Sequence, residues 1–182
     1  KLFPCLFGSA LKLEGVEALL ETLRRHAPLR TYGPEFGARV FKVSRDDRGA
    51  RLTWMKVTGG VLKTKDLLTN RRPDTPEEEV WEEKADQLRL YSGARFQPVD
   101  SAPAGTVVAV TGLSRALPGQ GLGYETAWTV PALEPVLAYQ METAADPSTA
   151  LKALRLLEEE DPQLRVSWTA GAVRVQLMGE VQ

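Results

Sequence analysis

Arg45, Arg48 and Arg51 flank one predicted turn in a chain whose formal net charge is -1. A guanidinium group is planar and holds a phosphate with two hydrogen bonds, so this loop is suited to contact a nucleic-acid backbone. Lys63 and Lys65 flank a second predicted turn. Ordinary surface solubility explains the same residues and is favoured when they are taken alone. The charge balance excludes a polycation, so any contact with RNA depends on such local patches.

Side chains that could carry catalysis or hold a metal are scarce. Cys5 is the single cysteine and His26 the single histidine, which excludes an internal disulfide and argues against a zinc site. A Cys–His nucleophilic pair is formally possible, but no neighbouring residue supports it. We interpret Cys5 as a buried strand residue, His26 as a helix-end residue, and the acidic runs 77–79 and 158–161 as solvated segments. The sequence therefore predicts no catalytic residue and no metal site.

A phosphate-binding loop is also missing from the sequence. Residues 119–123 are glycine-rich but lack the spacing G-x-G-x-x-G, and no helix is predicted after them, so we expect a tight turn between strands. The pattern G-x-x-x-x-G-K-[ST], whose backbone N–H groups and lysine hold nucleotide phosphates, does not occur in the 182 residues.

The four tryptophans are the aromatic residues with the largest flat surfaces. They are dispersed among predicted strands: Trp54, Trp81, Trp128 and Trp168. Core or half-buried positions explain such a dispersed set better than a platform on which nucleic-acid bases stack.

The elements that must position these residues begin with a strand and a helix. An apolar run over 2–7 predicts the strand, and apolar residues at helical spacing predict a helix over 14–26. The stretch 28–35 contains two prolines and Gly33 and predicts a linker. No apolar run approaches the ~20 residues that a membrane-spanning helix needs, and the beginning of the chain has no secretory signal pattern.

From residue 36 to 130 the sequence alternates short β-rich runs with turn signals. The polar stretch 71–79 carries two prolines and predicts an exposed loop. Many short strands at this spacing predict a closed antiparallel barrel. The expected strands are 38–43, 50–57, 80–90, 106–110 and 126–130.

The last segment has the predicted order strand, helix, strand, strand. A strand is expected over 136–141, and Asp146-Pro147 is a helix start because aspartate caps the first turn and proline fits its first position. Asp161-Pro162 ends that helix, and two alternating runs then predict a hairpin: 164–169 and 172–178. This is most of a small α+β domain, although a second helix would be needed to cover its sheet.

Taken together and in order, several stretches resemble one family. Residues 7–16, Phe-Gly-Ser-Ala-Leu-Lys-Leu-Glu-Gly-Val, resemble the last nucleotide-contacting motif and last G-domain helix of elongation factor G and its relatives. Lys65-Asp66 falls where the family usually has Gly-Asp, so the turn glycine is lost. Further stretches resemble the family's second and third domains: 36–43, 51–62 and 104–113 for the second, and 154–162, 165–166 and 178–180 for the third.

The third segment argues against the elongation-factor-Tu type, in which a second barrel follows the first. The ending Gly179-Glu180-Val181-Gln182 is similar to tetracycline ribosomal-protection proteins, whereas translocases more often read Gly-Glu-Leu-His there. Residues 4–5, 9–15 and 90–94 also resemble the protection-type branch. The chain therefore resembles a translational GTPase of the elongation factor G family, of the ribosomal-protection type.

This resemblance implies a mainly β fold with α+β. A translation-factor-type antiparallel β-barrel is expected over 34–131. It is flanked by a G-domain remnant of one strand and one helix, with its linker, over 1–33, and by a partial ferredoxin-like α+β domain over 132–182. The chain begins without Met on a strand-like run, and we expect it to be an internal fragment of a longer protein.

The implied parent is a cytoplasmic GTPase that binds GTP with Mg²⁺ and hydrolyses it at the factor site of the ribosome. In that parent, backbone N–H groups of Ser9, Ala10 and Leu11 would contact the guanine ring. The barrel would contact small-subunit ribosomal RNA, and the third domain would lie near a small-subunit ribosomal protein.

This chain by itself is expected to supply ribosome-binding surface and to be inactive, without cofactor, because the phosphate loop is absent. We expect a monomer with no DNA or membrane partner. A free-standing RNA- or protein-binding β-barrel module without a GTPase parent is the alternative. The strand–Gly-Ser-Ala–helix beginning favours the fragment, because a separate module would not need the end of a G domain.

Overall fold

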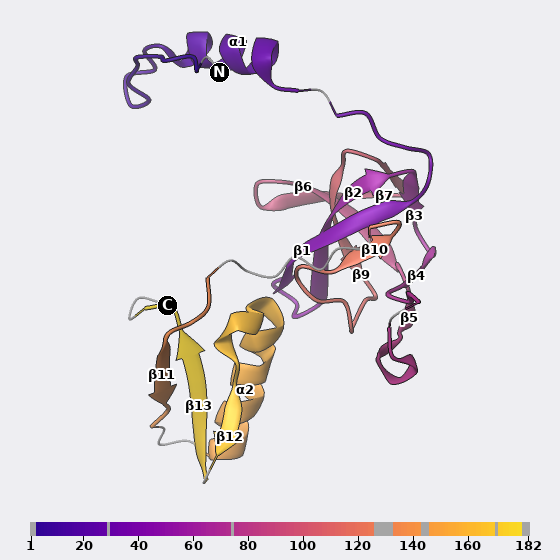
Figure 1. The fold of residues 1–182 in the computed structure, drawn as a ribbon, viewed down its shortest axis with the longest axis vertical. Coiled ribbons are helices and arrows are strands. Elements are labelled where there is room, and N and C mark those ends of the chain that lie inside the picture. The colour runs from indigo at the N-terminus through magenta and orange to yellow at the C-terminus, as the bar shows by residue number, and fades with distance from the viewer. Residues whose placement is uncertain are drawn as a thin grey trace. The chain divides into compact units, whose positions relative to one another are not determined.

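The computed structural model describes residues 3–28, 30–73, 75–125, 133–142, 146–169 and 171–179. The chain divides into two compact units, 1–31 and 32–182. Figure 1 labels their elements along the chain.

The first unit holds helix α1 (Val16–His26) behind a closed turn. Ser9 and Glu14 exchange both backbone hydrogen bonds, at 3.0 and 3.1 Å. Gly15 follows with a φ of 75°, and a Cβ there would lie 2.5 Å from the carbonyl oxygen of Phe7, so only glycine fits this close approach. The helix exposes its apolar stripe, with Leu20 59% and Leu23 53% exposed.

Two predictions for this unit are wrong. Residues 3–7 form no strand, because no neighbouring strand among the described residues of the unit offers them a ladder. Cys5 is exposed and not buried, since the run that carries it packs against no sheet.

The second unit begins with a β-rich part. Six strands form one antiparallel sheet in the order β10-β1-β2-β9-β6-β7, and two short ladders pair β3 with β8 and β4 with β5. A single-turn 3₁₀ helix, η1 (Glu77–Glu79), lies in the polar stretch that was predicted to be a loop. The strands are β1 (Gly37–Arg45), β2 (Arg51–Gly59), β3 (Val61–Lys63), β4 (Leu67–Thr69), β5 (Glu82–Lys84), β6 (Gln87–Ser92), β7 (Arg95–Val99), β8 (Ser101–Pro103), β9 (Val107–Thr111) and β10 (Gly121–Gly123).

One core joins the large sheet to both short ladders. Met55 of β2 and Leu88 of β6 are fully buried, and so are Leu62 of β3 and Ala102 of β8. Burial of each large apolar side chain stabilises the fold by about 1.5–3 kcal/mol. The shared core explains why strands as short as three residues hold their places.

The mainly β, antiparallel fold that the sequence predicts is confirmed, but the barrel is not closed by hydrogen bonds. Over the described residues no ladder joins β7 to β10, and the short ladders complete the wall around the core instead. The expected strand over 80–90 is interrupted between β5 and β6, because Ala85 N–H bonds to Asp66 while Asp86 N–H bonds to Thr111. The strand predicted over 126–130 lies outside the described residues.

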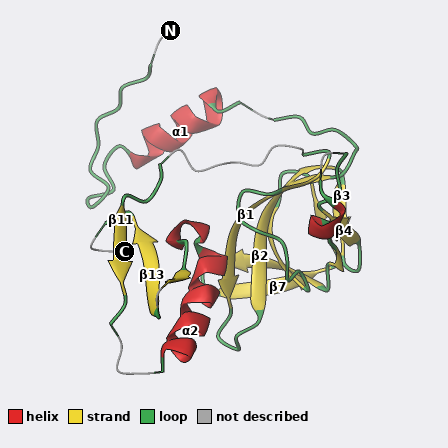
Figure 2. Ribbon diagram, turned by 60° about the horizontal axis from the view of Figure 1, so that its bottom comes forward, coloured by secondary structure: helices red, strands yellow, loops and turns green. Residues whose placement is uncertain are grey.

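The rest of the unit is a three-stranded antiparallel sheet with one helix along it (Figure 2). The Asp146 carboxylate accepts a hydrogen bond from the N–H of Thr149 at 3.1 Å, as expected of a helix cap. Leu154, Val166, Val173 and Val175 form a small core that shares no residue with the first core. The elements are β11 (Leu137–Gln140), α2 (Pro147–Glu160), η2 (Pro162–Leu164), β12 (Ser167–Thr169) and β13 (Ala172–Leu177), in the sheet order β11-β13-β12.

The predicted order strand, helix, strand, strand is therefore present here. The boundary expected at 131/132 falls outside the described residues and stays a prediction. Among the described helices, none has the length and apolar character needed to cross a membrane.

Candidate functional site

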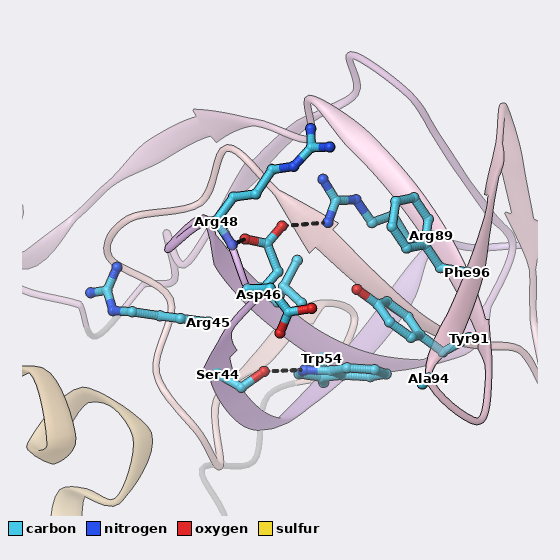
Figure 3. A pocket seen from close by; sticks show the side chains of 11 residues that line it. Ser44, Arg45, Asp46, Arg48, Trp54, Arg89, Tyr91, Ala94 and Phe96 are labelled. Atoms are coloured by element: carbon cyan, nitrogen blue, oxygen red, sulfur yellow. Dashed lines mark hydrogen bonds and ion pairs between the residues drawn. The ribbon is translucent and has the colours of Figure 1, made fainter.

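A pocket of about 500 Å³ opens beside the turn between β1 and β2, facing β6 and β7 (Figure 3). The turn is held from within by Asp46, whose carboxylate accepts hydrogen bonds from the backbone N–H of Arg48 at 3.0 Å and of Ala50 at 2.9 Å. Gly49 completes the turn with a φ of 79°, a conformation that glycine adopts without strain. The sequence thus forms a rigid turn that places Asp47 and Arg48 at the pocket.

An ion pair joins this turn to β6. The Arg89 guanidinium donates to the Asp46 carboxylate at 2.9 Å, and both side chains are largely buried, with 13% and 17% exposed. The hydrogen bond from Arg89, followed by that from the Ala50 N–H, holds the pKa of Asp46 below its usual range. The same carboxylate raises the pKa of Arg89. Both groups therefore stay charged near neutral pH, and the pair fixes the turn against the sheet.

Aromatic rings from three strands form a row along the pocket. Trp54 of β2 and Tyr91 of β6 have ring centroids 4.8 Å apart, and Tyr91 and Phe96 of β7 are 5.3 Å apart. The Arg89 guanidinium lies 4.4 Å from the centre of the Phe96 ring. The Trp54 indole N–H donates to the Ser44 hydroxyl at 2.8 Å. We call Trp54, Tyr91 and Phe96 the aromatic row.

The three arginines that flank the predicted turn have different surroundings in the structure. Arg48 is exposed, and its guanidinium has no partner among the described residues. Arg45 donates to Glu159 of α2 at 2.9 Å. Arg51 is 11% exposed and does not line the pocket. Arg45 and Arg48 line the pocket, and of these two only Arg48 keeps an unengaged guanidinium within the described structure.

Arg51 is occupied by neighbouring backbone groups. Its guanidinium donates to the carbonyl oxygens of Leu113 at 2.6 Å and Ala116 at 2.7 Å, to the Thr53 hydroxyl at 3.0 Å, and to Glu159 at 3.2 Å. These bonds tie the segment after β9 to β2. A contact of Arg51 with RNA stays a prediction, and it would compete with these four acceptors.

Lys63 and Lys65 lie at the turn between β3 and β4 and do not line the pocket. Lys65 has a φ of 68°, the conformation for which a glycine was expected at this position. Its ammonium group pairs with Asp86 at 2.8 Å, with both side chains more than half exposed. Both lysines remain candidates for RNA contact at a second surface.

Ser9, Ala10 and Leu11 lie in the closed turn before α1, beside a hollow of about 240 Å³ that Ser9 and Ala10 line. The Ser9 N–H is engaged with Glu14, and the Ser9 hydroxyl accepts weakly from the N–H of Lys12 at 3.4 Å. The N–H groups of Ala10 and Leu11 have no acceptor in the described part of the chain. A contact of these backbone groups with a guanine ring stays a prediction, and the residues that line this hollow include no phosphate-binding loop.

The sequence analysis missed Arg89, Tyr91 and Phe96, and it interpreted Trp54 as a core or half-buried residue, which agrees with its partly buried position. One signal was available: Arg89 and Tyr91 are two apart in a predicted strand, so they share a face. The pairing of Tyr91 with Phe96 across β6 and β7 could not be read from the sequence, because it depends on where β7 begins. Over the described residues no group of acidic, cysteine and histidine side chains is arranged to hold a metal ion.

Comparisons with known proteins agree with the fold. Residues 35–120 match the family described as elongation factor G domain 2. A crystal structure of a protein from Thermus thermophilus superposes with a TM-score of 0.72 at 24% identity, and covers 92% of this chain and 26% of that chain. At this identity the likeness shows the shared fold.

Relatives align along nearly the whole sequence. An oxytetracycline resistance protein of Streptomyces rimosus is 31% identical over 98% of this chain and 28% of its own length. Two proteins named elongation factor G 2, from Geobacter metallireducens and Syntrophus aciditrophicus, are 29% and 27% identical, over 91% and 98% of this chain. The chain spans 27% to 29% of the length of these relatives. The predicted resemblance is thus confirmed: residues 35–120 match the family described as elongation factor G domain 2, and the chain is similar to elongation factor G and to an oxytetracycline resistance protein.

Proposed function

We propose that the chain is part of a cytoplasmic, ribosome-dependent GTPase of the elongation factor G or ribosomal-protection type. In this proposal the chain supplies ribosome-binding surface, and GTP with Mg²⁺ is bound by the parent protein. The family match over 35–120 and the alignment of an oxytetracycline resistance protein with 98% of the chain support it. The partner is the small ribosomal subunit, through its RNA at the β-rich part and through a ribosomal protein near β11–β13, and the parent acts as a monomer without DNA or membrane.

The alternative, a free-standing binding module, is disfavoured by α1. This helix buries none of its residues, and its apolar stripe is exposed at Leu19, Leu20 and Leu23. Such a stripe is typical of a helix that packs on another part of a protein. In this proposal the remainder of a G domain would cover it.

The observation that carries the ribosomal proposal is Arg48. It stands exposed on a turn that Asp46 and Arg89 fix, and its guanidinium has no partner among the described residues. A preorganised, unpaired guanidinium suits contact with a phosphate, since no internal ion pair must be broken and the planar group can donate two hydrogen bonds. Arg45 and Arg51 are engaged with Glu159, so we expect them to contribute less.

Binding of the chain to purified small ribosomal subunits tests this proposal. We expect Arg48→Ala to weaken binding and to reduce the slope of log affinity against log salt by about 0.7–0.9. The matched control is Arg30→Ala, an exposed arginine outside both proposed contact surfaces, which should leave both quantities unchanged. Equal affinity and equal slope for wild type and Arg48→Ala would contradict the assigned contact, and failure of the wild type to bind any subunit would contradict the function.

A further inference from the structure

We propose that the pocket beside the β1–β2 turn binds one unpaired RNA nucleotide. Its base lies against the aromatic row, and its phosphate lies at Arg48. This inference rests on the proposed function and deepens it, because it assigns a single extruded nucleotide of structured RNA as the ligand of a defined pocket.

The aromatic row is on the outer face of the sheet. Trp54 alternates along β2 with Thr53 and Met55, which are both fully buried, so its indole faces away from the core. Phe96 is 44% exposed, and none of the three rings belongs to the core cluster. Rings at such positions offer flat apolar surface to solvent, and nucleic-acid bases stack on this kind of surface whatever their sequence.

The charges at the pocket favour a nucleotide over a purely anionic or apolar ligand. Arg89 and Asp46 neutralise each other, and Arg45 is paired with Glu159. Asp47 and Arg48 remain exposed, and the side chain of neither has a partner in the described structure. A nucleotide complements both, because its phosphate accepts from a guanidinium and the amino group of a cytosine, adenine or guanine base donates to a carboxylate.

The pocket is held in shape before any ligand arrives. Asp46 closes the turn and is clamped by Arg89, whose guanidinium lies against the Phe96 ring. In Figure 3 the side chains of Arg48 and Arg89 extend to the same side of Asp46, and Arg89 lies beside the Phe96 ring. A preorganised pocket loses little conformational freedom on binding, which favours affinity for a small ligand.

The experiment uses the whole 182-residue chain and a fluorescein-labelled oligocytidylate of about eight nucleotides, a length within the range that one small barrel covers. Fluorescence anisotropy gives the affinity, and quenching of tryptophan emission reports stacking. We expect Phe96→Ala to weaken binding about tenfold. Arg48→Ala should weaken it and reduce the salt slope by about 0.7.

Matched controls separate the pocket from general surface effects. Phe41→Ala removes a comparably exposed ring of β1 that does not line the pocket, and Arg174→Ala removes a charge elsewhere; neither should change affinity. Oligouridylate carries a carbonyl where cytosine has its amino group, so it should bind more weakly. Asp47→Asn should abolish that preference.

Two results would overturn the pocket assignment. One is wild-type affinity of Phe96→Ala for the oligocytidylate while its thermal unfolding shows an intact fold. The other is displacement of the probe by an acidic peptide that contains phenylalanine but not by cytidine monophosphate, which would assign the pocket to a protein partner. If small-subunit binding persists in either case, only the pocket is refuted; if the chain binds the oligonucleotide but no ribosomal subunit, only the ribosomal function is refuted.

Discussion

At the scale of single residues, Arg51 stabilises the fold, although the sequence analysis placed it among the arginines that could contact RNA. Its guanidinium donates hydrogen bonds to the carbonyl oxygens of Leu113 and Ala116, and Arg51 and Arg45 both form an ion pair with Glu159. The pair with Glu159 is partly exposed, so solvent weakens its contribution. The bonds to the two carbonyls matter more, because buried acceptors without donors are costly.

We expect Arg51→Ala to lower the free energy of unfolding by about 2–3 kcal/mol, since it leaves those carbonyls without a donor. Arg48→Ala is the matched control and should change stability by less than about 0.5 kcal/mol, as is usual for an exposed side chain. Urea denaturation measures both changes from the shift of the unfolding midpoint, when the dependence of the unfolding free energy on urea concentration is the same for all variants. Identical midpoints for the two variants would show that water replaces the guanidinium without cost.

At the scale of elements, the turn between β3 and β4 carries backbone strain. Lys65 adopts a φ of 68°, which costs a residue with a side chain about 1–2 kcal/mol. The turn is nevertheless well defined, because the Asp66 carboxylate accepts from the N–H of Lys63 at 2.7 Å and the Lys65 N–H bonds to Ala85 at 2.7 Å. The loss of the family's usual glycine is therefore compensated by fixed hydrogen bonds.

Lys65→Gly is expected to raise the free energy of unfolding by about 0.5–1 kcal/mol. The backbone strain that glycine relieves is larger in free energy than the conformational entropy that glycine adds to the unfolded chain. The exposed ion pair with Asp86 contributes little to stability, so its loss costs little. Lys63→Gly should instead destabilise, because Lys63 pairs with Ser101 in a strand. Thermal unfolding of the two variants is the measurement, and a lower midpoint for Lys65→Gly than for wild type would contradict the strain argument.

At the scale of the whole molecule, the backbone N–H groups of Ala10 and Leu11 have no acceptor in the described part of the chain, and the sequence contains no phosphate-binding loop. We expect no GTP hydrolysis and no binding of GTP at micromolar concentrations with Mg²⁺ present, because phosphate and metal contacts provide most of the affinity in such proteins. Isothermal titration calorimetry measures this, and oligocytidylate binding by the same preparation is the positive control. A micromolar dissociation constant for GTP would refute the prediction.

The sequence by itself determined the features that are local along the chain. Alternation of apolar residues predicted the strands that bury Val40, Met55 and Val108, and Asp146 with Pro147 predicted the start of α2. The order of motifs also predicted the family, which the match over 35–120 confirms. Strand periodicity and caps could be predicted because they act over a few neighbouring residues, and the family could be predicted because each of its motifs is a short run of the sequence.

Only the tertiary structure decided which distant groups meet. Three arginines that are neighbours in the sequence divide into an exposed one, Arg48, and two that bind Glu159 more than a hundred positions away. Trp54 joins Tyr91 and Phe96 because β2, β9, β6 and β7 are adjacent in one sheet, although Trp54 and Tyr91 are far apart in sequence. Such meetings depend on strand order and register, and both follow from how the whole chain packs its core rather than from any local pattern.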